Sequence, residues 1–130
     1  MAEVNMGETV RAHYKSGTYI GKVLEDRGNQ YLIEVLAVVK HPMQGDLHNP
    51  GQVEEVFFHE RKALAPHEKM NVKKPAVHPY TDEVPAYNDS LKQAVDIYKE
   101  KLASESTTFN EKALQTLNEL ENSHYRKQFY

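Results

Sequence analysis

The first part of the chain alternates apolar and polar residues with a period of two, which is the pattern of half-buried β-strands. One alternating segment runs from Thr9 to Tyr14, and a second follows a turn at residues 15–17. Gly21 interrupts the second segment, and a glycine inside a strand indicates a bulge or a tight bend. A turn at residues 27–29 leads to a third strand.

The third strand, from Tyr31 to Lys40, changes its pattern halfway. Its first half alternates, but residues 35–39 are apolar at every position. A strand that is apolar on both faces is expected to be covered on both faces. One face can fill the core of the sheet, and the helices expected downstream are the nearest cover for the other.

Turn formers and polar side chains dominate residues 41–51, which indicates an ordered loop. A fourth strand is expected over residues 53–59, and residues 61–69 add either a short fifth strand or an irregular return. Short strands separated by glycine turns are typical of a small SH3-like barrel, here residues 1–69. Residues 70–83 are expected to be a linker, because Pro75 and Pro79 oppose a continuous helix or central strand.

The apolar period then changes to that of an α-helix. Spacings of three and four place six residues on one helical stripe: Val84, Tyr87, Leu91, Val95, Tyr98 and Leu102. Residues 104–107 break the pattern, and Thr108 with Glu111 reads as a capping box that starts a second helix. Its stripe comprises Phe109, Ala113, Leu117, Leu120 and His124. Residues 84–130 are thus predicted to form an antiparallel αα-hairpin, packed on or beside the barrel.

The sequence therefore predicts an α+β fold, with an SH3-like antiparallel β-barrel followed by a C-terminal antiparallel αα-hairpin. The chain has 130 residues and no cysteine, which excludes disulfides and thiolate chemistry. The longest apolar run, residues 35–39, is far shorter than a membrane span. The N-terminus lacks the basic flank and apolar core of a signal peptide. We expect a cytoplasmic protein with no direct membrane insertion.

Charge does not favour a nucleic-acid partner. The net charge is −3, from 16 basic and 19 acidic residues. Binding to a phosphate backbone relies on clustered basic residues. Small SH3-like barrels often bind RNA, however, and Tyr14, Tyr19 and Tyr31 could stack on bases. An RNA- or ribosome-associated barrel therefore stays open as the alternative function.

Candidate chemistry is sparse. His41, Asp46, His48 and His59 could converge as nitrogen and oxygen metal ligands, but their spacing matches no metal motif. The serines do not sit on a strand-to-helix elbow, and the glycines are too scattered for a phosphate-binding loop. We therefore expect no enzyme, no catalytic residue, no metal and no cofactor.

The most promising working surface is the histidine-bearing loop and the residues that follow the fourth strand. Such a loop is long for a small barrel, and long loops are often functional. The candidate partner-binding residues are His41, Gln44, Asp46, His48, Asn49, His59, Glu60 and Arg61. The alternative is an ordered structural loop in which Asp46 and Asn49 cap local turns.

Three runs carry a family resemblance: GETVRAHYKSGTYIG at residues 7–21, AVVKHPMQGDLHNP at 37–50 and VFFHERKAL at 56–64. Together they resemble the kinase-associated protein B family of spore-forming Gram-positive bacteria. The proline segment and helical tail also fit the plan of that family.

The resemblance implies an accessory role beside a membrane sensor histidine kinase that feeds the sporulation phosphorelay. It implies a protein partner, with peripheral membrane association through that kinase, and it supplies no catalytic residue or cofactor. Proteins of this family have also been called lipoproteins, but this sequence has no cysteine to lipidate. Homo-oligomerisation stays open.

Overall fold

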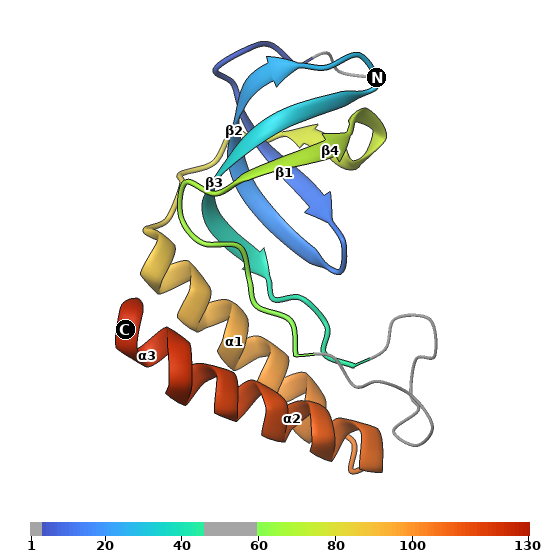
Figure 1. Ribbon diagram of the computed structural model, residues 1–130, viewed down its shortest axis with the longest axis vertical. Helices are drawn as coiled ribbons and strands as arrows, with labels where there is room; N and C mark the ends of the chain where they lie inside the picture. The colour runs from blue at the N-terminus through green and yellow to red at the C-terminus, as the bar shows by residue number, and fades with distance from the viewer. Residues whose placement is uncertain (1–3, 46–59) are drawn as a thin grey trace.

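The computed structural model describes residues 4–45 and 60–130 of the chain. A curled antiparallel sheet occupies one end of the molecule and the helices occupy the other (Figure 1). This confirms the predicted α+β class, with a barrel-like β half followed by a helical region.

The sheet has five strands among the described residues: β1 Thr9–Tyr14, β2 Gly17–Asp26, β3 Gln30–Lys40, β4 Lys69–Lys73 and β5 Val77–Pro79. Their order is β4-β3-β2-β1-β5, and each neighbouring pair is antiparallel. The sheet curls so far that β1 also contacts β4. That curl produces the barrel-like shape.

Gly21 lies at a β-bulge, as its place in the sequence predicts. The pairing of β2 with β3 shifts register between Ile20 and Gly21. A Cβ atom at this position would lie 2.7 Å from the backbone oxygen of Glu34, closer than real side chains allow. Only glycine lets the two strands approach so closely here.

The segment expected to be a linker, residues 70–83, instead contributes most of β4 and all of β5. Neither proline lies at a position where it would interrupt the hydrogen bonds between strands. Pro75 lies in a short 3₁₀ turn, Lys74–Ala76, between the two strands. Pro79 ends β5, which is an edge strand and so tolerates a residue without an N–H donor. Residues 60–68 form the irregular return, and the strand expected at 53–59 lies outside the described residues.

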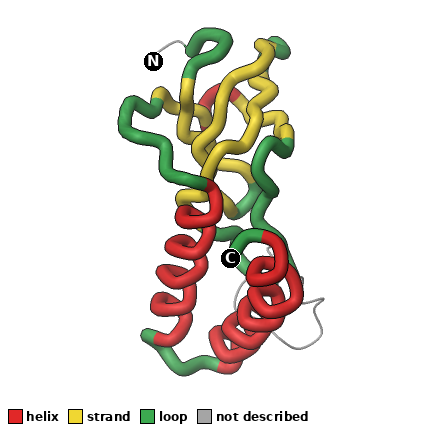
Figure 2. Tube along the Cα trace, turned by 90° about the vertical axis from the view of Figure 1, so that its left-hand side faces the viewer, coloured by secondary structure: helices red, strands yellow, loops and turns green. Residues whose placement is uncertain are grey.

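Two long helices follow, α1 Tyr87–Ala103 and α2 Thr108–Leu120, and they lie side by side (Figure 2). A π-helical turn at Glu121–Tyr125 and a short α3, Arg126–Gln128, complete the chain. The cap of α2 is Thr107, whose side chain accepts a hydrogen bond from the Asn110 backbone at 3.0 Å. The capping box predicted at Thr108 is therefore displaced by one residue.

The helical stripes bury most of the residues that their spacing predicts. On α1, Tyr87, Leu91, Val95 and Leu102 are buried, but Val84 precedes the helix and stays exposed. On α2, Ala113, Leu117 and Leu120 are buried. The π-turn then adds one residue to the repeat, so that Tyr125 takes the fully buried position predicted for His124.

Sheet and helices share one buried apolar cluster. Val35, Ala37 and Val38 of β3 are buried, and α1 packs against this strand. The backbone N–H of Val38 donates to the Ser90 hydroxyl of α1 at 3.0 Å. Val39, at the end of the apolar run, remains 37% exposed.

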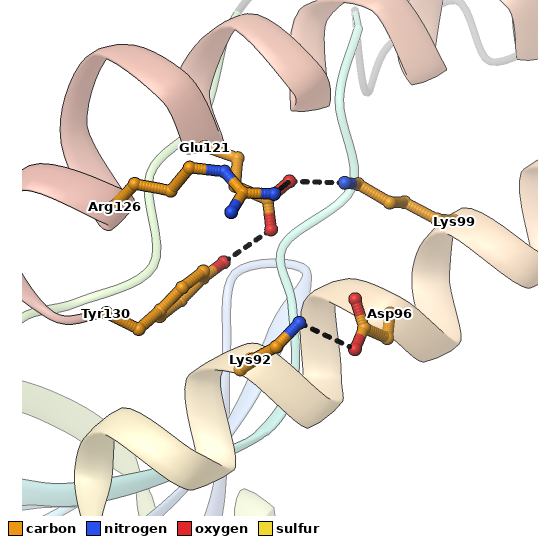
Figure 3. Close-up of polar contacts among 6 residues, drawn as sticks. All are labelled: Lys92, Asp96, Lys99, Glu121, Arg126 and Tyr130. Atoms are coloured by element: carbon orange, nitrogen blue, oxygen red, sulfur yellow. Dashed lines mark hydrogen bonds and ion pairs between the residues drawn. The ribbon is translucent and has the colours of Figure 1, made fainter.

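A buried carboxylate holds the C-terminal turn against α1 (Figure 3). Glu121 is 2% exposed and pairs with both Lys99 and Arg126. The Tyr130 hydroxyl donates to its second oxygen at 2.7 Å. Burial alone would raise the pKa of Glu121, but the hydrogen bonds from Lys99 and Tyr130 hold that pKa below its usual value.

Candidate partner-binding site

The structure describes both ends of the predicted working loop. Residues 41–45 leave β3, and residues 60–63 return toward the sheet. Of the eight predicted residues, His41, Gln44, Glu60 and Arg61 are described. Asp46, His48, Asn49 and His59 lie outside the described residues and stay predictions.

His41 is a buried residue that links the start of the loop to the C-terminal turn. Its Nδ1 lies 2.8 Å from the Pro42 carbonyl oxygen, and its Nε2 lies 2.7 Å from the Tyr125 hydroxyl. The carbonyl can only accept, so Nδ1 carries the proton and Nε2 accepts from Tyr125. Burial lowers the pKa of His41 to about 4, although its hydrogen bond to Pro42 opposes that shift. The ring is therefore neutral at pH 7.

Gln44 closes the base of the loop. Its side-chain Oε1 accepts from the Arg61 backbone N–H at 2.9 Å, and its Nε2 donates to the Arg61 carbonyl at 2.9 Å. The backbone N–H of Gln44 also donates to the Tyr98 hydroxyl of α1 at 2.9 Å. These bonds join both ends of the loop to each other and to the helices.

These contacts change the interpretation of two predicted residues. His41 and Gln44 are each 1% exposed, and their polar groups are bonded inside the protein. They hold the ends of the loop in place and do not offer side chains to a partner. Glu60 is exposed, whereas Arg61 is half-buried and donates to the Gly45 carbonyl.

A cleft of about 290 Å³ opens beside Arg61. It lies between the turn that joins β1 to β2 and the return segment after the loop. Its lining residues are Tyr14, Lys15, Tyr19, Pro42, Arg61, Lys62, Leu64 and Glu68. The Ser16 hydroxyl accepts from the Met43 backbone at 2.8 Å, which ties the β1–β2 turn to the loop.

Positive charge prevails around this cleft. Lys15, Arg61 and Lys62 face a single acidic lining residue, Glu68. The Glu68 carboxylate already accepts from the Ala65 backbone at 3.0 Å. The cleft is at the small end of the range for ligand pockets, so it suits one or two side chains of a partner. Negatively charged side chains match it best.

Sequence reasoning did not find most of this cleft. Arg61 was predicted and its neighbour Lys62 was not, while Lys15 was missed because it is distant in sequence from Arg61. The bond between Ser16 and Met43, 27 residues apart, joins the Lys15 turn to the start of the loop, and Gln44 joins that start to Arg61. The alternation of apolar and polar residues in β1 and β2 locates the turn that contains Lys15. It does not show which distant segment of the chain packs beside that turn.

Two further features concern the described ranges, 4–45 and 60–130. There, no three histidine or acidic side chains gather closely enough to hold a metal ion. The helices of that part of the chain are too short or too polar to cross a bilayer.

Comparison with known proteins identifies relatives over nearly the whole chain. A family model described as kinase associated protein B matches residues 14–125. The kinase-associated lipoprotein B of Bacillus subtilis strain 168 is 40% identical over 127 residues, covering 98% of this chain and 99% of that protein. The crystal structure of kinase-associated protein B from Bacillus cereus superposes with a TM-score of 0.80. It is 34% identical, and the match covers 94% of this chain and 98% of that one. The chain therefore belongs to the kinase-associated protein B family.

Proposed function

We propose that this protein is a non-catalytic accessory protein that binds a membrane sensor histidine kinase and regulates its signal to the sporulation phosphorelay. Family membership carries the proposal, because both named relatives are described as kinase-associated. The sensor-kinase partner and the sporulation role come from the sequence resemblance. The protein would act in the cytoplasm and reach the membrane through its kinase.

The architecture supports a binding role. The described segments that flank residues 46–59, namely 41–45 and 60–63, are joined by a framework of buried hydrogen bonds through His41 and Gln44. A rigid framework lowers the entropic cost of ordering a binding loop. We place the kinase contact at Glu60, Arg61 and the adjacent basic cleft, together with Asp46, His48, Asn49 and His59 of the loop.

Three buried titratable groups of the described residues, His41, Tyr125 and Glu121, serve structure. His41 and Tyr125 bond to each other in the interior, and Glu121 is neutralised by two cations. General acid or base catalysis needs such a group in reach of a substrate. A regulator that works by binding fits these interior roles.

The test is binding of the full chain to the sensor histidine kinase of the same organism, purified in lipid nanodiscs. We expect saturable binding that Lys15→Glu combined with Lys62→Glu weakens about tenfold. The matched control is Lys73→Glu with Lys127→Glu, which changes the net charge equally at exposed positions away from the cleft. No binding to the kinase would overturn the proposal.

The alternative function is tested in the same format with single-stranded RNA. An RNA-binding barrel would bind with an affinity that falls steeply as salt rises. Tight RNA binding together with no kinase binding would favour the ribosome-associated alternative.

A further inference from the structure

Exposed apolar side chains gather where the end of β3 meets α1. Four large apolar residues of the described part are at least a third exposed: Met6, Val39, Val84 and Ile97. Val39 and Ile97, the latter 56% exposed, line the same two hollows. Val84 directly precedes Pro85, which lines the larger hollow. Apolar side chains clustered in this way mark an interaction surface more often than scattered ones do.

The two hollows flank this pair of residues. The larger, about 250 Å³, extends toward Tyr80 and Pro85, and the smaller, about 70 Å³, extends toward Met43 and Tyr98. Both include Val39, Ala94 and Ile97. We name this surface the β3–α1 face. Figure 1 shows the end of β3 beside α1 at this place.

The α1 residues of the β3–α1 face follow the spacing of one helical stripe: Ser90, Gln93, Ala94, Ile97, Tyr98 and Lys101. Ser90 and Ala94 of this stripe are buried beside the core residues of α1, whereas Gln93, Ile97 and Lys101 are exposed. One side of α1 thus serves the core of the protein. The exposed part of the neighbouring side has the apolar side chain of Ile97 at its centre.

The charged residues that line the β3–α1 face indicate what kind of partner would cover it. The charged residues that line the two hollows are Lys40 and Lys101, and both border the smaller hollow. A second copy of the chain would bring the same lysines and no carboxylate from its own β3–α1 face. A segment with apolar residues beside acidic ones complements the apolar centre and the lysines together.

We propose that the β3–α1 face is a second docking surface, which binds an amphipathic helix with acidic residues next to its apolar stripe. This inference rests on the proposed function, because the helix is assigned to the kinase partner. Helices bind in this way by placing residues of one face into successive hollows. The face is distinct from the basic cleft, which is lined by other residues.

The test again uses the full chain and the kinase in nanodiscs. Ile97→Asp should weaken binding about tenfold or more, as loss of a central apolar contact does. Met6→Asp is the matched control, because Met6 is similarly exposed at 52% but lies outside both hollows. Lys40→Glu with Lys101→Glu should also weaken binding, whereas the corresponding glutamine variants should have a smaller effect. Circular dichroism and melting curves identify variants that fail to fold.

Each outcome of the binding experiment either supports or overturns the β3–α1 proposal. Wild-type binding that Ile97→Asp and the lysine variants leave unchanged overturns the β3–α1 proposal and leaves the proposed function standing. An absence of wild-type binding overturns both. Analytical sedimentation tests whether a second copy of the chain covers the face instead. A wild-type dimer that Ile97→Asp converts to a monomer would assign the face to that second copy and overturn the helix proposal.

Discussion

The Tyr125 hydroxyl lies 2.7 Å from Nε2 of His41, a residue 84 positions earlier in the chain. The same hydroxyl accepts from the Ala63 backbone N–H at 2.9 Å. One oxygen atom thus joins the start of the loop, the segment that follows it and the C-terminal turn. The π-turn places Tyr125 where it can make these contacts.

Removing this oxygen should destabilise the protein. Tyr125→Phe keeps the buried ring but leaves Nε2 of His41 and the Ala63 N–H without this partner, so we expect a loss of about 2 kcal/mol in unfolding free energy. Urea denaturation measures it. Tyr80→Phe removes a hydroxyl that bonds only the neighbouring Glu83 carbonyl at an exposed site, and its cost should be well below 1 kcal/mol. Equal losses in the two variants would contradict the interior role of Tyr125.

His41 should make stability fall in mild acid. Burial lowers its pKa from 6.5 to about 4 in the folded state, so the unfolded chain binds the proton more tightly. Stability from this group is complete above pH 6.5 and declines as pH falls toward about 4, by up to about 3 kcal/mol in total.

The measurement compares the unfolding free energy of wild type and His41→Gln from about pH 7 to about pH 5. The other histidines titrate in both proteins, so the difference in slope reports His41. In wild type, His41 should make the unfolding free energy fall with pH by an amount that approaches about 1.4 kcal/mol per pH unit. We expect His41→Gln to lose this contribution. Parallel curves would show that folding does not lower the pKa of His41.

The sequence predicted those parts of the fold that depend on local periodicity. The spacing from Tyr87 to Leu102 locates α1, and the glycine inside β2 locates the bulge. Strand β4 was missed although Met70 and Val72 alternate with polar residues, because the nearby prolines suggested a linker. Tyr125 was missed because a π-turn changes the repeat, and no helical period anticipates that extra residue.

The candidate site was predicted less completely, because its contacts are long-range. A loop rich in turn formers suggests exposed side chains, yet His41 and Gln44 are buried by partners far away in sequence. Arg61 lines the cleft, as a partner-binding role requires. Lys15 lines the same cleft only because folding brings its turn close to Arg61.

The β half should depend on the helices. Truncation after Tyr80 removes α1, exposes Val38 and leaves its backbone N–H without the Ser90 hydroxyl. We expect the fragment to aggregate or to melt at a much lower temperature than the full chain. Light scattering and thermal melts provide the measurement. A soluble monomeric fragment with an unchanged melting temperature would contradict a shared core.

Glu121→Gln should loosen the C-terminal turn. The substitution removes a charge that pairs with Lys99 and Arg126, and we expect a loss of about 1–2 kcal/mol, because both cations can reach water. Since the pKa of Glu121 is below its usual value, its contribution is present near neutral pH and is lost as pH falls through the folded-state pKa. The loss between wild type and variant should therefore shrink in strong acid. Asp96→Asn is the surface control, because the Lys92–Asp96 pair is half exposed.

Substitutions in the predicted loop can distinguish side chains that stabilise the fold from side chains that bind a partner. Gln44→Ala removes hydrogen bonds from a side chain that is 1% exposed, and should lower the unfolding free energy by about 2 kcal/mol. Asp46→Ala combined with His48→Ala should leave stability within about 0.5 kcal/mol and weaken kinase binding, if those side chains contact the partner. The alternative, in which they only cap local turns, predicts the reverse for the double variant: lower thermal stability with unchanged affinity per folded molecule. Chemical denaturation and kinase binding measured on the same preparations therefore distinguish the two interpretations. Gln44→Ala supplies the reference for a purely structural loss at the same loop.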